Sequence, residues 1–161
     1  MYPSEIGQFS GIDFACPVTE AELAAIRQVP EEMVKNAFAG LTGESYVPKD
    51  WGGERSDLCT SRAIVRGRQV SAAWLFKGRG HPYPMTVKAL GKPGDQIGRL
   101  FSEPAELLVL QHCHQVTTAV VDMMDTYPHD LRNPRSYMII DGADTSRILK
   151  PLGLLPVFPT R

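Results

Sequence analysis

Residues 56–80, SDLCTSRAIVRGRQVSAAWLFKGRG, have the pattern of a β-hairpin. Residues 58–65 and 69–77 are rich in β-branched and apolar side chains, and the sequence Arg-Gly-Arg at 66–68 supplies a glycine turn between them. The acid Asp57 precedes the first run and Lys77 ends the second, with three arginines and no other acid between them. This arrangement predicts an antiparallel pair of strands with an acid and a lysine near one end.

The length of the turn fixes which residues of the two strands are opposite each other. If residues 66–68 form the turn, Asp57 is opposite Lys77 and their Cβ atoms are about 5 Å apart. A two-residue turn at 66–67 or 67–68 moves the partner of Asp57 to residue 76 or 78. Side-chain alternation along strands predicts one common face for residues 57, 59, 61 and 63 and for residues 71, 73, 75 and 77. The pair is either part of a functional site or a structural ion pair that closes the hairpin.

The segments on either side of the hairpin predict an α/β fold. Two helices and a short strand are expected before it, at 19–29, 30–43 and within 43–54. After it we expect a helix at 94–101, a strand at 106–111, a helix at 115–127, a strand at 135–141 and a helix at 144–153. The strand–helix–strand unit at 106–140 implies a parallel pair with a right-handed crossover. The predicted architecture is therefore a single domain, residues 1–161, with a mixed central sheet flanked by helices.

The composition is that of a globular domain without a membrane segment. The chain has 161 residues, 43% of them hydrophobic and 22% charged, and a net charge of -1. Its first residues have neither a basic nor an apolar run of the kind found in signal peptides, and every apolar run is short. Its three cysteines are too scattered for a disulfide framework. The sequence predicts a cytoplasmic protein and leaves its oligomeric state open, a homodimer included.

Positive charge is concentrated in the middle of the chain. Residues 51–100 contain nine Lys or Arg and three Asp or Glu, which gives this third a charge of +6. Such a segment either attracts a polyanion or forms an ordinary mixed surface. The first reading predicts salt-sensitive binding of nucleic acid through the basic residues of this third: Arg62, Arg66, Arg68, Arg79, Lys88 and Lys92.

The order of the elements around Asp57 and Lys77 resembles that of the PD-(D/E)XK nuclease superfamily, which includes many restriction endonucleases. The resemblance covers residues 30–112 as an α-β-β-β-α-β core, and residues 106–161 add a βαβ extension that ends in a helix. It implies that the acid that begins one strand, Asp57, binds Mg²⁺ or Mn²⁺. It also implies that the lysine that ends the next strand, Lys77, helps to activate the water that attacks a phosphodiester bond.

The sequence departs from the superfamily pattern at the second acid. Two residues before the lysine, where the family has a metal-binding acid, this chain has Leu75. Some members carry this acid on the following helix, where Asp95 is available, although an Asp at the start of a helix is also an ordinary N-cap. Glu54 is another candidate metal ligand. Glu31, in the first turn of its helix, either contributes to the site or interacts with the helix dipole.

Two hypotheses about function follow. Hard Mg²⁺ held by one or two carboxylates neutralises phosphate charge and supplies an activated water, which favours a metal-dependent nuclease. The missing acid at Leu75 favours a nuclease-like fold that binds nucleic acid or a protein partner without cutting. Gln111 and His112, at the end of a predicted buried strand, either line the same cleft as Lys77 or simply end that strand.

Overall fold

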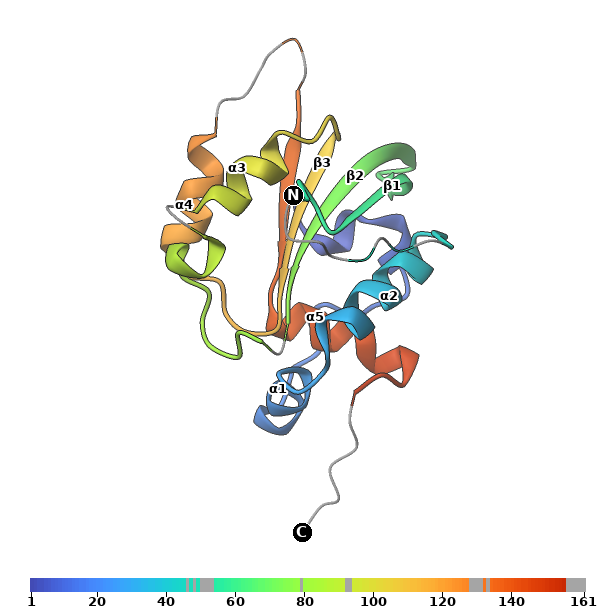
Figure 1. The fold of residues 1–161 in the computed structure, drawn as a ribbon. Helices are drawn as coiled ribbons and strands as arrows, with labels where there is room; N and C mark the ends of the chain where they lie inside the picture. Colours follow the sequence, from blue (N-terminus) through green and yellow to red (C-terminus); the bar gives the residue numbers. More distant parts are fainter. Residues whose placement is uncertain are drawn as a thin grey trace.

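The computed structural model describes residues 1–45, 47, 49, 54–78, 80–91, 94–127, 132 and 134–155. Two short 3-10 helices, η1 (Pro3–Glu5) and η2 (Gly7–Phe9), begin the chain. The main elements follow in the order α1 (Glu20–Ile26), α2 (Glu31–Leu41), β1 (Leu58–Val65), β2 (Arg68–Lys77), α3 (Asp95–Phe101), β3 (Leu107–His112), α4 (Thr118–Thr126), β4 (Ser136–Ile140) and α5 (Gly142–Leu149) (Figure 1). Two further 3-10 helices, η3 (Val87–Leu90) and η4 (Lys150–Leu152), lie between β2 and α3 and after α5.

The four strands form one mixed sheet in the order β1-β2-β3-β4. Strand β1 is antiparallel to β2, whereas β3 and β4 run parallel to β2. Helices α3 and α4 cover one face of the sheet, and α1, α2 and α5 lie on the other side (Figure 1). The mixed sheet flanked by helices and the parallel β3–β4 pair are therefore confirmed. The strand expected within 43–54 is absent from the described residues of that stretch, so the described core has one strand fewer than predicted.

The hairpin has the predicted strands but a different register. Its turn is the two-residue Arg66–Gly67, with φ of 49° and 78°, which is the left-handed geometry of tight hairpin turns. A bulge between Thr60 and Ala63 then shifts the pairing by one more residue, because two residues of β1 are opposite Ser71 of β2. Leu58 consequently pairs with Trp74, and continuing this register puts Asp57 opposite Leu75. The prediction that Asp57 is opposite Lys77 was wrong.

Because of the bulge, one residue lies on a different face of the sheet from the one predicted. Beyond the bulge, Ala63 pairs with Val70 and belongs to the same hydrophobic cluster, on the face opposite to the one expected. Cys59, before the bulge, pairs with Ala73, whose cluster faces α3. By alternation, Asp57 and Lys77 lie on this α3 side of the hairpin, so they share a face, as expected.

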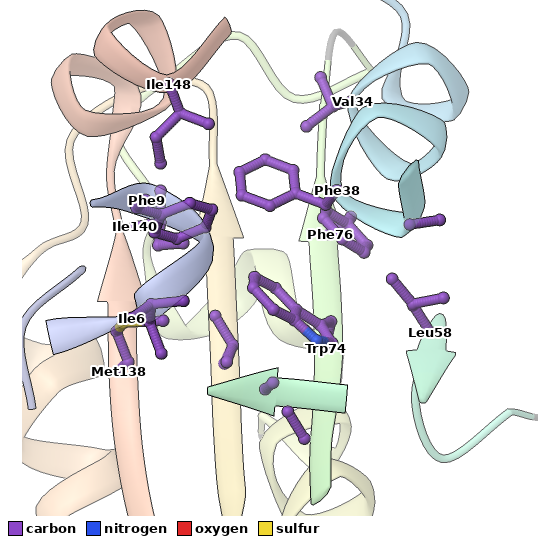
Figure 2. Close-up of a cluster of buried hydrophobic side chains, with 14 of the residues drawn as sticks. Ile6, Phe9, Val34, Phe38, Leu58, Trp74, Phe76, Met138, Ile140 and Ile148 are labelled. Carbon is purple, nitrogen blue, oxygen red and sulfur yellow. The ribbon is translucent and has the colours of Figure 1, made fainter. Parts of the chain in front are cut away.

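Aromatic packing fixes the position of α2 against the end of β2. Phe38 of α2 lies with its ring centroid 5.3 Å from that of Trp74 and 5.7 Å from that of Phe76. Trp74 and Phe76 project from the same face of β2 because they are two residues apart, and Figure 2 shows them beside Phe38. All three side chains are fully buried. The N-terminus of α2 contacts the residue that follows β2 through a separate hydrogen bond, from the N–H of Gly78 to Glu31.

No helix in the described part of the chain is long and apolar enough to cross a membrane.

Candidate functional site

A polar cleft of about 180 Å³ lies at the end of the hairpin where β1 begins and β2 ends. It is formed by the first turn of α2, the segment before β1, the last residues of β2 and helix α3. Its lining residues are Glu31, Glu54, Arg55, Asp57, Leu75, Lys77, Gln96 and Arg99. The structure thus brings together Asp57, Lys77, Glu54 and Glu31, four residues that the sequence had singled out.

Two carboxylates of the cleft accept hydrogen bonds from the backbone on either side of Lys77. Oδ2 of Asp57 accepts the N–H of Phe76 at 2.6 Å, and Oε2 of Glu31 accepts the N–H of Gly78 at 2.8 Å. Strand β1 begins only at Leu58, so it offers no backbone carbonyl beyond this point to the edge of β2. The two acids satisfy donors that would otherwise lack a partner in the sheet.

The carbonyl of Lys77 is held from the other side by β3. It accepts the N–H of Cys113 at 3.3 Å, and Nδ1 of His112 lies 3.1 Å from it. The other ring nitrogen of His112, Nε2, lies 2.7 Å from the carbonyl oxygen of Tyr83. Burial lowers the pKa of His112 below its usual value, because desolvation penalises the imidazolium. The ring of His112 therefore lies between the backbone of Lys77 and the loop that follows it.

Neither residue expected at the end of β3 lines the cleft. Gln111 is fully buried, and its side-chain amide donates to Oγ1 of Thr145 in α5 at 3.0 Å. His112 is also fully buried, and besides its backbone contacts its ring centroid lies 5.7 Å from that of His81. Gln111 therefore has a structural contact with α5 and no place in the cleft. His112 lies outside the cleft as well, against the backbone of Lys77.

Glu54 and Asp95, the two alternatives for the second acid, lie in different places. Glu54 lines the cleft. Asp95 is the first residue of α3 and does not line the cleft. Its Oδ2 lies 3.5 Å from Nη2 of Arg99, and half of its side chain is exposed. Gly94, rather than Asp95, is the N-cap of this helix. Glu54 is therefore the alternative acid that shares the cleft with Asp57.

Helix α3 contributes two residues that the sequence had not indicated. Gln96 and Arg99 both line the cleft, and Oε1 of Gln96 and Nε of Arg99 are buried without a hydrogen-bond partner among the described residues. The guanidinium of Arg99 also donates to the backbone carbonyl of Glu54 at 3.2 Å. Helical spacing could have indicated Gln96, which lies about 100° around the helix from the core residue Ile97 and so borders the buried face. Arg99 lies about 160° around the helix from Ile97, so spacing gave no signal for it.

The arginines near the hairpin turn lie at the other end of the strands from the cleft. Arg66 pairs with Glu5, Arg68 pairs with Glu106 at 2.8 Å, and Arg62 donates to the carbonyl of Gly43 at 2.6 Å. Lys88 is exposed on η3. Arg79 and Lys92 lie outside the described residues. The four described residues of this set, Arg62, Arg66, Arg68 and Lys88, thus do not line the cleft, where the described cationic residues are Arg55, Lys77 and Arg99.

The structure also limits the metal chemistry. Within the described residues, no three His, Cys, Asp or Glu side chains are grouped so that they could hold a metal ion. Mg²⁺ is commonly bound through one or two carboxylates and several waters. The donor set in the cleft, Asp57 and Glu54, therefore fits a water-rich Mg²⁺ site and not a site made entirely of protein ligands.

Replacing Gly78 with Ala tests whether the cleft depends on close packing behind Lys77. A Cβ at this position would lie 2.5 Å from Cβ, 2.7 Å from Cα and 2.9 Å from N of Glu31, so the first turn of α2 must move. We expect Gly78→Ala to lower the free energy of unfolding by about 2 kcal/mol, as overpacked sites do. Urea denaturation measures this loss. Gly80→Ala is the matched control, because a Cβ there meets nothing within 4 Å; equal effects of the two changes would contradict the packing.

Comparison with protein-family models, with curated proteins and with solved structures gave no match to this chain.

Proposed function

We propose that this chain is a divergent nuclease of the PD-(D/E)XK type, which hydrolyses phosphodiester bonds in nucleic acid with Mg²⁺ or Mn²⁺. The observation that carries the proposal is the cleft in which Asp57, Lys77 and Glu54 meet. Asp57 precedes the first strand of an antiparallel pair and Lys77 ends the second, which is the arrangement that the resemblance requires. The one-residue bulge changes their register and leaves them on a common face.

Asp57 and Glu54 are the residues that would hold the metal ion. When bound, Mg²⁺ would neutralise phosphate charge and lower the pKa of a coordinated water. The residues of the chain supply the rest. The amine of Lys77 orients the attacking water and donates to the phosphate oxygens, and the guanidinium groups of Arg55 and Arg99 hold the anionic backbone in the cleft.

A second candidate function is binding of nucleic acid without hydrolysis. Leu75 favours it, because an apolar side chain lies opposite Asp57 where the superfamily has its second acid. Backbone hydrogen bonds also give Asp57 and Glu31 a structural use that requires no metal. Both functions place nucleic acid at the same cleft.

One experiment separates the two functions. The protein is titrated with Mn²⁺ in a calorimeter and then incubated with a mixed panel of DNA and RNA, single-stranded, duplex and branched, with and without the metal. Metal-dependent cleavage supports the nuclease. Binding of nucleic acid without metal uptake or cleavage supports the binding module, and the absence of both overturns the two proposals together.

The contribution of Arg99 to binding is a separate prediction. We expect Arg99→Gln to weaken binding of a short single-stranded oligonucleotide about tenfold and to reduce the salt slope by about 0.7, because one phosphate contact is lost. Arg66→Gln should change either quantity much less, because Arg66 is paired with Glu5 at the far end of the hairpin. Fluorescence anisotropy at several salt concentrations measures both variants. Equal losses from the two changes would indicate diffuse binding over the basic third and would contradict a role of the cleft.

A further inference from the structure

Lys77 has an unusually well-defined backbone for a residue at the end of a strand. The N–H before it is held by Asp57, its carbonyl by β3, and the N–H after it by Glu31. Of these contacts, the one from Glu31 joins the residues farthest apart in the chain, because Glu31 opens α2 and Gly78 follows β2. The position of the lysine therefore depends on the position of α2.

Glycine at position 78 makes this contact possible. The ideal Cβ position of residue 78 is occupied by atoms of Glu31, including the helix backbone at 2.7 and 2.9 Å. Helix α2 is also held by Phe38, one of its buried residues, which packs against both Trp74 and Phe76 of the same strand. The aromatic contact and the Glu31–Gly78 hydrogen bond thus attach α2 to the chain at two points. The first precedes Lys77 in β2, and the second is the residue directly after it.

We propose that Glu31 is a positioning residue, whose carboxylate fixes the backbone after Lys77 and thereby the place of the lysine amine in the cleft, and that it is not a metal ligand. The effect on rate rests on the proposed nuclease function, whereas the anchor itself does not. The two roles of Glu31 have different chemical requirements. A carboxamide accepts an N–H bond as a carboxylate does, but it lacks the charge that a Mg²⁺ or Mn²⁺ ligand needs.

Three variants of α2 separate these roles. Glu31→Gln keeps an acceptor for Gly78, Glu31→Ala removes it, and Glu32→Ala removes an exposed acid from the same first turn as a control. We expect Glu31→Ala to accelerate hydrogen exchange at the Gly78 amide by about tenfold or more and to lower kcat by up to about a hundredfold. Glu31→Gln and Glu32→Ala should stay near the wild type in both quantities, and Mn²⁺ affinity should be unchanged in all three.

The readouts also keep this proposal distinct from the proposed function. If the wild type cuts no substrate, the nuclease proposal fails, but exchange at Gly78 and the NMR shift of a ¹³C-methylated Lys77 amine still report on the anchor. Changes of both in Glu31→Ala, with rescue in Glu31→Gln, support positioning. Loss of Mn²⁺ affinity in Glu31→Gln would identify a metal ligand instead. If the exchange rate at Gly78 and the NMR shift of the Lys77 amine are both unaltered in Glu31→Ala, the hydrogen bond does not hold Lys77. Either this result or the loss of Mn²⁺ affinity in Glu31→Gln overturns the proposal.

Discussion

Asp57→Asn is expected to abolish Mn²⁺ binding and to lower cleavage by about a thousandfold or more, while the protein keeps its fold. Loss of a metal ligand removes several kcal/mol of transition-state stabilisation, and each 1.4 kcal/mol is a factor of ten in rate. The asparagine can still accept the N–H of Phe76 through its amide oxygen, so the hydrogen bond made by Oδ2 of Asp57 is preserved. Calorimetric Mn²⁺ titration and cleavage assays measure the two losses, and denaturation measures stability.

Two further variants complete this experiment. Lys77→Met should retain metal binding and lose rate, because the carboxylates remain and the amine is removed. Asp57→Ala should lose metal binding and also stability, since the N–H of Phe76 then loses its acceptor at a partly buried site. If Asp57 and Lys77 are merely a surface pair, Asp57→Asn and Lys77→Met should each change stability by at most about 1 kcal/mol and alter neither metal binding nor cleavage.

The sequence predicted the parts of the site that depend on strand patterns. Alternating apolar residues defined both strands of the hairpin, and the parity of β2 placed Leu75 and Lys77 on one face, as in the structure. The mixed sheet followed from an antiparallel hairpin joined to a strand–helix–strand unit. These features are encoded locally, in the period of the hydrophobic side chains and in the length of the crossover.

The sequence could not predict the features that depend on contacts between distant segments. The bulge between Thr60 and Ala63 has no glycine to mark it, yet it decides that Asp57 is opposite Leu75. The ion pairs of Arg66 with Glu5 and of Arg68 with Glu106 join segments 61 and 38 residues apart. Charge counted along the chain therefore predicted a basic surface, whereas the fold pairs part of that charge with acids from other thirds of the chain.

The position of Leu75 gives the remaining prediction, a gain of metal dependence. Leu75 is 6% exposed, lines the cleft and is opposite Asp57 when the register of the hairpin is continued. A carboxylate at this position would lie where the superfamily has its second acid. Without metal, Leu75→Glu should be destabilised by about 3 kcal/mol, because it buries a second negative charge near Asp57. Most of that loss should return with saturating Mn²⁺, since a metal at 100 times its Kd stabilises the folded state by about 2.7 kcal/mol.

Thermal unfolding with and without Mn²⁺ measures this recovery, and Leu75→Gln is the matched control. Glutamine has the same shape, but its neutral amide costs less to desolvate than a carboxylate and lacks the charge that would make it a strong metal ligand. Metal should therefore rescue the glutamate variant and not the glutamine variant, and the Mn²⁺ affinity of Leu75→Glu should exceed that of the wild type. Equal destabilisation of Leu75→Glu with and without Mn²⁺ would mean that no metal binds beside Asp57. The cleft would then have to act through Lys77, Arg55 and Arg99 alone, as an anion-binding surface rather than a hydrolytic centre.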